Sequence, residues 1–196
     1  MKGLLPPLLP ASNWPAENKS LASLLTIGHS TRHFSELIEV LRAHSVQVLA
    51  DIRSFPRSRR LPHFNREALQ QSLPNEGIRY LWLKSLGGRR TKICQNSPNR
   101  ALRNESFRNY ADHMMTEEFR RGITELLALA GEVRTAYMCA ERVYFRCHRM
   151  LVSDWLVTHG HEVSHIDSTA PCQAHQLTPE ARLVDGQLLY RGDLLL

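Results

Sequence analysis

The sequence lacks several features that mark particular classes of protein. Only four of its 196 residues are cysteines, at 94, 139, 147 and 172, and their spacing fits neither a CxxC pair nor a zinc finger. This favours a reduced, cytoplasmic chain over a secreted domain held by disulfides. No run of 18 apolar residues occurs, so no segment is expected to span a membrane. Internal repeats and low-complexity segments are also absent.

The first 20 residues contain an apolar patch that does not fit a signal peptide. Pro6, Pro7 and Pro10 interrupt the patch, and no small-residue cleavage site follows it. We therefore expect residues 1–20 to form a loosely ordered tail.

Lysine is scarce, whereas arginine is abundant. The 25 basic residues comprise 4 Lys and 21 Arg, and the formal net charge is +6. Basic proteins favour anionic partners, and guanidinium groups suit phosphate or carboxylate groups better than ammonium groups do. The alternative is that the arginines are spread over solvent-exposed faces without a binding role, which would give the same number of arginines and the same net charge. Only their clustering on the fold distinguishes the two interpretations.

Apolar residues alternate between strand and helix periods along residues 21–167. Strands are expected over 21–28, 46–53, 78–83, 133–138 and 162–166, with helices between them. This order predicts a single three-layer α/β domain with a mainly parallel sheet of about five strands and helices on both faces. Residues 168–196 form a C-terminal extension. It should contain a small β-hairpin, because Asp185 and Gly186 separate two apolar runs.

Conspicuous polar groups follow the carboxyl ends of four expected strands. In chain order they are His29 and Ser30, then Asp51 and Arg53, then Gly87, Gly88, Arg89 and Arg90, then Cys139 and Glu141. Parallel strands present their carboxyl ends at one edge of the sheet, where ligands bind in open α/β folds. The sequence therefore predicts a functional site at this edge.

The stretch 133–160 is the expected centre of that site, because it reads as a strand, a polar loop and a helix. Cys147, His148 and Arg149 fall at the expected start of this helix, where free N–H groups and the helix dipole favour anions. Cys147 lies between Arg146 and His148, an environment that lowers the pKa of a thiol.

Four residues are the predicted catalytic groups: Glu141, Asp51, His29 and Cys139. Two carboxylates at neighbouring strand ends can serve as general acid and base, or as nucleophile and partner. The structural alternative is that Asp51 pairs with an arginine and that Glu141 pairs with Arg149. Cys139 can equally be a small buried residue. No Cys-x5-Arg phosphate cradle is present, because Arg146 lies one position too late.

Two basic segments are the predicted anion-binding loops, because prolines stiffen 54–65 and two glycines allow close backbone approach at 87–90. The predicted substrate-binding residues are Ser30, Arg53, Arg57, Ser58, Gly87, Gly88, Arg89, Arg90, Cys147, His148 and Arg149. Phe55, Phe64 and Trp82 interleave with these arginines, as on surfaces that stack bases.

Five blocks of this sequence resemble a known family, the domain-of-unknown-function family 488. They are TIGHS (26–30), LADIRSFPRSRRLPHFN (49–65), IRYLWLKSLGGRR (78–90), YADHM (110–114) and MCAERVYFRCHRMLVSDWL (138–156). The resemblance implies an α/β domain, in agreement with the pattern above. It implies no activity, because the family has none assigned.

We expect an enzyme that acts on a phosphate-bearing substrate, a nucleotide or nucleic acid, by hydrolysis or by glycosyl or other group transfer. One alternative is a non-catalytic nucleic-acid-binding module. Another is a metal-dependent redox or sensing protein that holds zinc or iron through Cys139, Cys147 and His148. The leading interpretation needs no cofactor and no metal. The oligomeric state stays open.

Overall fold

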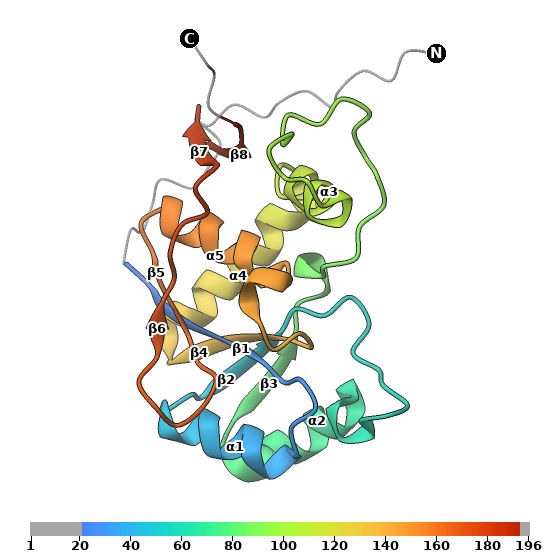
Figure 1. The fold of residues 1–196 in the computed structure, drawn as a ribbon. Helices are drawn as coiled ribbons and strands as arrows, with labels where there is room; N and C mark the ends of the chain where they lie inside the picture. The colour runs from blue at the N-terminus through green and yellow to red at the C-terminus, as the bar shows by residue number, and fades with distance from the viewer. Residues whose placement is uncertain (1–20, 193–196) are drawn as a thin grey trace.

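Parallel strands with helices on both faces make up the fold seen in a computed structural model, which describes residues 21–192 (Figure 1). The strands are β1 (Ser23–Gly28), β2 (Val48–Asp51), β3 (Arg79–Trp82), β4 (Thr135–Cys139), β5 (Glu162–His165), β6 (Gln173–Ala174), β7 (Ala181–Val184) and β8 (Gln187–Tyr190). The α-helices are α1 (Phe34–Ala43), α2 (Arg66–Ser72), α3 (Glu105–His113), α4 (Glu117–Glu132) and α5 (Arg149–Thr158).

The strand order of the main sheet is β3-β2-β4-β1-β5-β6. Strands β1 to β5 are parallel, and β6 pairs antiparallel to β5. The chain steps outward from β1 to β2 and β3, then returns through β4 and continues to β5. Right-handed crossovers in opposite directions place their helices on opposite faces. Accordingly α1 and α2 cover one face, and α4 and α5 cover the other (Figure 1).

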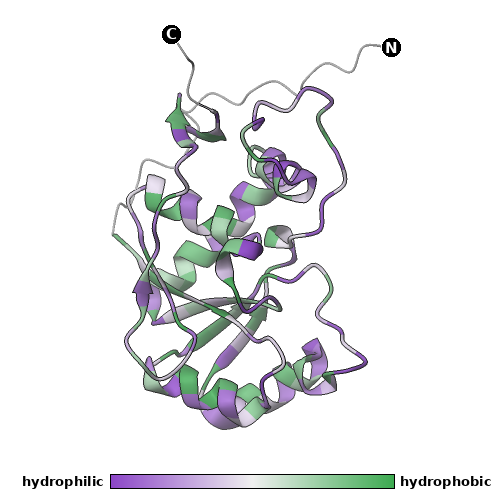
Figure 2. Ribbon diagram, viewed as in Figure 1, coloured by the Kyte–Doolittle hydropathy of each residue, from purple (hydrophilic) through white to green (hydrophobic). Residues whose placement is uncertain are grey.

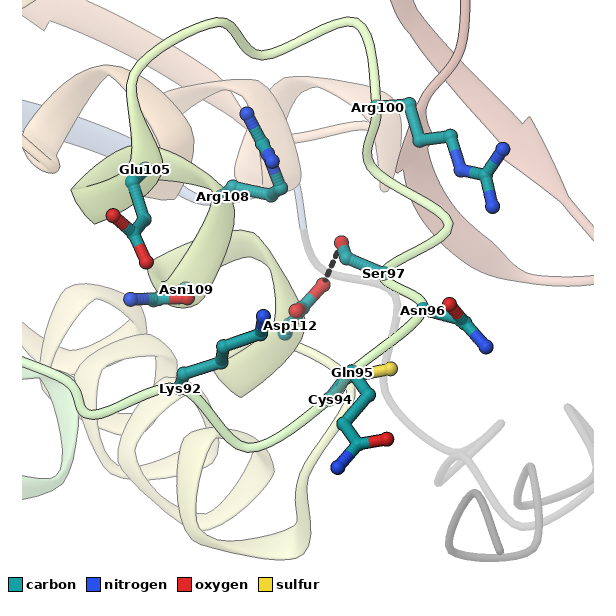
Figure 3. A pocket seen from close by; sticks show the side chains of 10 residues that line it. All are labelled: Lys92, Cys94, Gln95, Asn96, Ser97, Arg100, Glu105, Arg108, Asn109 and Asp112. Carbon is teal, nitrogen blue, oxygen red and sulfur yellow. Dashed lines mark hydrogen bonds between the residues drawn. The ribbon is translucent and has the colours of Figure 1, made fainter. Parts of the chain in front are cut away.

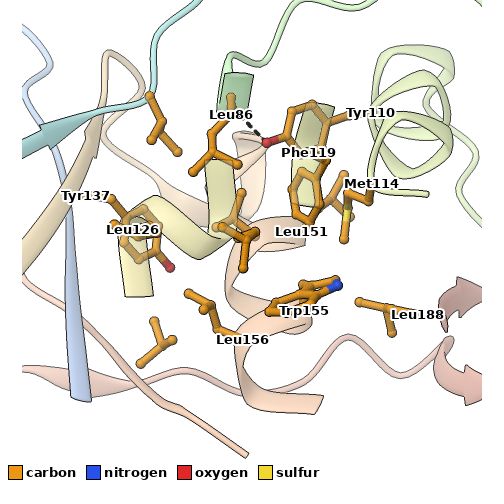
Figure 4. Packing of buried hydrophobic residues seen from close by; sticks show 14 of the residues in the cluster. Leu86, Tyr110, Met114, Phe119, Leu126, Tyr137, Leu151, Trp155, Leu156 and Leu188 are labelled. Carbon is orange, nitrogen blue, oxygen red and sulfur yellow. Dashed lines mark hydrogen bonds between the residues drawn. The ribbon is translucent and has the colours of Figure 1, made fainter. Parts of the chain in front are cut away.

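Each face of the sheet has its own apolar core. Leu37, Ile38 and Leu41 of α1 are buried with Ile27 of β1 on one face, as the i, i+4 stripe of that helix predicts. On the other face α3, α4 and α5 contribute Tyr110, Phe119 and Trp155, which Figure 4 shows packed with Leu151. Hydrophobic residues accordingly dominate the strands, whereas α3 and the loop before it are mostly hydrophilic (Figure 2).

The predicted α/β architecture is confirmed, with one addition. Strand β6 makes the sheet six-stranded, and the sequence did not indicate it because both its residues are exposed and carry no apolar pattern. The hairpin β7-β8 is confirmed. Asp185 (φ 50°) and Gly186 (φ 75°) both adopt positive φ, as a two-residue type I′ turn requires.

The expected N-terminal tail, residues 1–20, lies outside the described residues. The boundary at 167/168 between core and extension stays a prediction. The extension is hydrogen-bonded to the core, because Tyr190 donates its hydroxyl to Asp154 at 2.8 Å and its backbone N–H to Asn99 Oδ1 at 3.0 Å. Within residues 21–192, no helix is both long and apolar enough to cross a membrane.

Candidate functional site

The carboxyl ends of β1, β2 and β4 meet at one edge of the sheet, as predicted. The backbone N–H of His29 donates to Cys139 O at 2.9 Å, and that of Ile52 donates to Met138 O at 2.9 Å. Gly28 is in register with Cys139, and a Cβ on Gly28 would lie 1.9 Å from Glu141 O. Only glycine allows the β4 loop to approach β1 so closely. This approach brings Cys139 and its loop over the strand ends.

A buried ion pair joins the two polar residues of the β2 end. The Arg53 guanidinium donates from Nε at 2.9 Å and from Nη2 at 2.5 Å to the two carboxylate oxygens of Asp51. Tyr80 donates its hydroxyl to Asp51 at 2.7 Å, and the Trp82 indole donates to Arg53 O at 2.8 Å. Asp51 is fully buried and Arg53 is 6% exposed. This pairing is the structural alternative that the sequence left open for Asp51.

His29 is also buried, and both its ring nitrogens are engaged. Nδ1 donates to Ser30 O at 2.9 Å, so Nε2 is the acceptor for Arg53 Nη1 at 3.1 Å. Burial, reinforced by the Arg53 charge, lowers the pKa of His29 from 6.5 to about 4. The ring stacks on Phe64, with centroids 4.1 Å apart. In this arrangement His29 is neutral and its lone pair is occupied.

Cys139, Cys147 and His148 form a thiol–imidazole cluster beside this pair. Their ligand atoms, two Sγ and the His148 nitrogen, all lie within 4.8 Å of one another. His148 Nε2 donates to Ile52 O at 3.1 Å, which leaves Nδ1 with its lone pair. Nδ1 lies 3.5 Å from Cys147 Sγ and 3.9 Å from Cys139 Sγ. The lone pair therefore faces both sulfurs.

The two thiols of the cluster differ in their protonation. The hydrogen bond from Cys139, aided by the Arg149 charge, holds the pKa of Cys147 well below its usual value. The same bond and burial raise the pKa of Cys139 well above its usual value. As the pH rises, Cys147 therefore loses its proton before Cys139 does.

Arg149 supplies a buried positive charge beneath the cluster. It is 1% exposed and donates to Glu141 O at 2.6 Å, Arg142 O at 2.9 Å and Thr26 Oγ1 at 3.2 Å. All three acceptors are neutral, and no carboxylate among residues 21–192 pairs with it. The positive charge of Arg149 contributes to the lowered pKa of Cys147.

The predicted catalytic residue Glu141 lies in the same loop but in a different environment. Its side chain is exposed, and its carboxylate accepts the backbone N–H of Val143 at 3.1 Å. The sequence allowed a Glu141–Arg149 ion pair, and Arg149 instead contacts the backbone carbonyl of Glu141. The catalytic roles of Glu141, Asp51, His29 and Cys139 stay predictions.

The small residues predicted to bind anions mainly shape the loops. The backbone N–H of Ser58 donates to Asn65 Oδ1, and Ser58 Oγ accepts from Leu61 N. Ser30 (φ 51°) donates its N–H to Ala140 O. Gly87 donates its N–H to Lys84 O, and Gly88 packs against the His148 ring, where a Cβ would lie 2.4 Å from Nδ1. Gly88 thus fixes one wall of the thiol–imidazole cluster.

The predicted arginines divide into two groups. Arg53, Arg90 and Arg149 are engaged within the protein, and Arg90 donates to Gly87 O and Ser85 O and pairs with Glu118. Arg57 and Arg89 are exposed: Arg57 lies 3.7 Å from Glu67, and Arg89 lies over the Phe55 ring at 6.0 Å. The backbone N–H of Arg89 donates to Ser54 Oγ at 2.7 Å, so the two basic loops lie side by side.

The family described as Domain of unknown function DUF488 matches residues 33–156 of the chain. The chain belongs to this family. No curated protein and no solved structure matches it. The matched region of this DUF488 protein runs from the start of α1 into α5, and it includes every member of the thiol–imidazole cluster.

Sequence reasoning missed one buried polar network of this DUF488 protein. Asp154 is fully buried and accepts from His175 Nε2 at 2.9 Å, and His175 Nδ1 contacts His165 Nε2 at 2.9 Å. Thr178 and Tyr190 donate to the same carboxylate. Asp154 lies among the apolar residues of a helix, and this position was the one sign in the sequence that it would be buried. A carboxylate on such a stripe must find partners from elsewhere in the chain.

Proposed function

We propose that this protein is a metal-dependent hydrolase for a phosphate-bearing substrate, with the ion held by the thiol–imidazole cluster of Cys139, Cys147 and His148. The observation that carries the proposal is the spacing of the three ligand atoms. Zinc binds sulfur at about 2.3 Å and imidazole nitrogen at about 2.0–2.1 Å in a tetrahedral arrangement. That arrangement separates sulfur and nitrogen by about 3.5 Å, and two sulfurs by about 3.8 Å.

The two sulfur–nitrogen distances in the protein are close to this requirement. Nδ1 lies 3.5 Å from one sulfur and 3.9 Å from the other, and all three atoms fall within 4.8 Å. The lone pair of Nδ1 faces the sulfurs because Nε2–H is held by Ile52 O. Such a partner on the second nitrogen orients a metal-binding histidine. The lowered pKa of Cys147 favours the thiolate, which is the form that binds metal.

Three protein ligands leave one position of a tetrahedral ion for water or substrate. Structural zinc sites fill all four positions with protein atoms, whereas catalytic sites keep one open. Among the described residues, no further His, Cys, Asp or Glu joins the group. Cys139 is partly exposed, whereas Cys147 and His148 are buried, so the Cys139 side of the cluster lies nearest to solvent. A bound ion would lower the pKa of a water and polarise a phosphoryl oxygen.

The surroundings of the cluster favour an anionic substrate. Arg57 and Arg89 extend into solvent from the two adjoining basic loops, together with Arg59 and Arg60. Guanidinium groups bind phosphate oxygens in pairs. Phe55 is 68% exposed beside Arg89 and offers a ring on which a base can stack. A nucleotide or a nucleic acid fits these groups.

Elemental analysis of protein purified without added metal or chelator tests the metal. We expect about one equivalent of zinc or iron, lost in Cys147→Ser and in His148→Gln. Cys172→Ser is the matched control, because Cys172 is an exposed free cysteine outside the cluster. Reduced protein that contains no metal and takes up none on titration with zinc would refute the proposal.

Hydrolysis is tested separately, with metal-loaded protein and a panel of phosphate monoesters, phosphodiesters and nucleotides. We expect turnover that chelation abolishes and that zinc or iron restores. A fully loaded protein that hydrolyses none of the panel would refute the hydrolase assignment and leave a binding or sensing role for the metal.

A non-catalytic nucleic-acid-binding module is the second candidate, favoured by the exposure of Phe55 among arginines. Such a module would bind single-stranded oligonucleotides with a strong salt dependence. Phe55→Ala would weaken that binding, and removal of the metal would leave it unchanged.

A further inference from the structure

A polar cavity lies away from the thiol–imidazole cluster, between helix α3 and the loop that precedes it (Figure 3). Its volume is about 320 Å³, which is the size of a site for one small molecule. Apart from Cys94, its described lining residues are polar or charged, and they include Lys92, Ser97, Arg100, Glu105 and Asp112. None of the described residues that line it is aromatic, so stacking of a nucleobase is not supported.

The distinctive group of this cavity is the Asp112 carboxylate. Asp112 is 1% exposed, and its Oδ1 accepts from Ser97 Oγ at 2.5 Å and from Asn99 Nδ2 at 2.8 Å. Asn99 is held in turn by the backbone N–H of Tyr190 at 3.0 Å. These bonds fix the orientation of the carboxylate. Its second oxygen, Oδ2, has no hydrogen-bond partner among the described residues.

A buried carboxylate oxygen without a donor is unfavourable, because burial removes its water without replacing the lost hydrogen bonds. Native proteins rarely leave such a group unsatisfied. An ammonium or amino group of a ligand would supply the strongest donor, since a charged donor and a charged acceptor reinforce each other. The cavity therefore selects for a nitrogen donor at its buried end.

The opening of the cavity carries the opposite preference. Arg100, Lys92 and the acidic Glu105 are exposed residues of its lining, whereas Arg108 is engaged by the carbonyls of Leu102 and Arg103. The two exposed cations outnumber the one exposed acid, and this favours an anionic group on the ligand. The ligand is thus positive at one end and negative at the other.

We propose that this cavity binds a small zwitterion, whose ammonium group donates to Asp112 Oδ2 and whose phosphate or carboxylate contacts Arg100 and Lys92. The proposal is independent of the metal centre, since it uses none of its residues. Helix α3 does connect the two places. Tyr110, two residues before Asp112, contacts the His148 ring with centroids 4.9 Å apart.

The side chain of Lys92 could compete with a ligand for Asp112 Oδ2. Figure 3 shows its side chain directed along the cavity toward Asp112, and a lysine that swung inward would satisfy Oδ2 without a ligand. The two cases differ in what the wild-type protein binds. If Lys92 fills the site, no zwitterion binds until Lys92→Met removes it.

Calorimetric titration with four probes tests the proposal: phosphoethanolamine, phosphocholine, inorganic phosphate and β-alanine. Phosphocholine has the same phosphate but no N–H donor, so we expect phosphoethanolamine to bind at least about tenfold more tightly. Asp112→Asn should abolish this preference and leave inorganic phosphate unchanged. β-Alanine shows whether a carboxylate replaces the phosphate.

Arg100→Gln provides a second variant that leaves the buried carboxylate intact. It should weaken phosphoethanolamine and inorganic phosphate by the same factor, and it keeps the test decisive if Asp112→Asn does not fold. Three results would each overturn the proposal: no binding of any probe by wild-type protein, equal binding of phosphoethanolamine and phosphocholine, or binding that appears only in Lys92→Met.

Discussion

Asp51→Asn is the substitution whose effect on the free energy of unfolding follows most directly from the structure. The Asp51 carboxylate accepts from Arg53 Nε and Nη2 and from the Tyr80 hydroxyl, and neither Asp51 nor Arg53 has appreciable contact with solvent. An amide of the same shape would leave the guanidinium buried without a counter-charge. Breaking a buried ion pair in this way costs about 3–5 kcal/mol. That is a large part of the stability of a typical domain.

Urea unfolding followed by tryptophan fluorescence and by circular dichroism measures this loss. The matched control is Glu67→Gln, which breaks the exposed contact of Glu67 with Arg57 at 3.7 Å and should cost less than about 1 kcal/mol. The double variant Asp51→Asn/Arg53→Gln should lose less than the sum of the single losses, because it removes both buried charges. A cost below about 1 kcal/mol for Asp51→Asn would refute the structural role given to the pair.

Three further predictions concern the site and its support. Gly88→Ala should lower the affinity for metal about 10–100-fold, because the new Cβ would displace the imidazole of the cluster. Competition with a chelator measures this affinity. Gly131→Ala is the control and should leave the affinity unchanged, because nothing lies within 4 Å of the added Cβ. The pKa of His29 falls from 6.5 to about 4 on folding, so the unfolded chain takes the proton first, and this residue alone should lower the free energy of unfolding by about 2 kcal/mol from pH 7 to pH 5. Equal pH dependence of unfolding in His29→Gln would contradict this. Tyr190→Phe removes the hydrogen bond to Asp154 and should lower the free energy of unfolding by about 1–3 kcal/mol. Hydrogen-exchange protection in β8 should fall as well. Unchanged protection would show that this bond does not hold β8 to the core.

The chain order of the elements was predictable because it depends on local patterns. The apolar stripe of α1 and the Asp185-Gly186 turn both specify local structure without help from distant residues. The same patterns placed Asp51, Cys139 and His148 near one edge, since every parallel strand ends on the same side. The strand order was not predictable, because crossover handedness restricts topologies without selecting one.

Side-chain partners were less accessible to sequence reasoning. Arg53 looked available to a substrate, but it is occupied by Asp51, by His29 and by the carbonyl of Phe64. These contacts join residues up to 24 positions apart and depend on how far each side chain reaches past its strand end. Asp112 is a second case, because only the fold shows that one of its oxygens is buried without a donor.

X-ray absorption at the edge of the bound metal tests the central claim most directly, because it counts the atoms around the ion. We predict two sulfur atoms at about 2.3 Å and one imidazole nitrogen at about 2.0–2.1 Å, with a fourth light atom from solvent. Cys147→Ser should remove one sulfur from this shell. A shell of oxygen and nitrogen alone, or four sulfur or imidazole ligands with no position left for solvent, would contradict a metal-dependent hydrolase built on Cys139, Cys147 and His148.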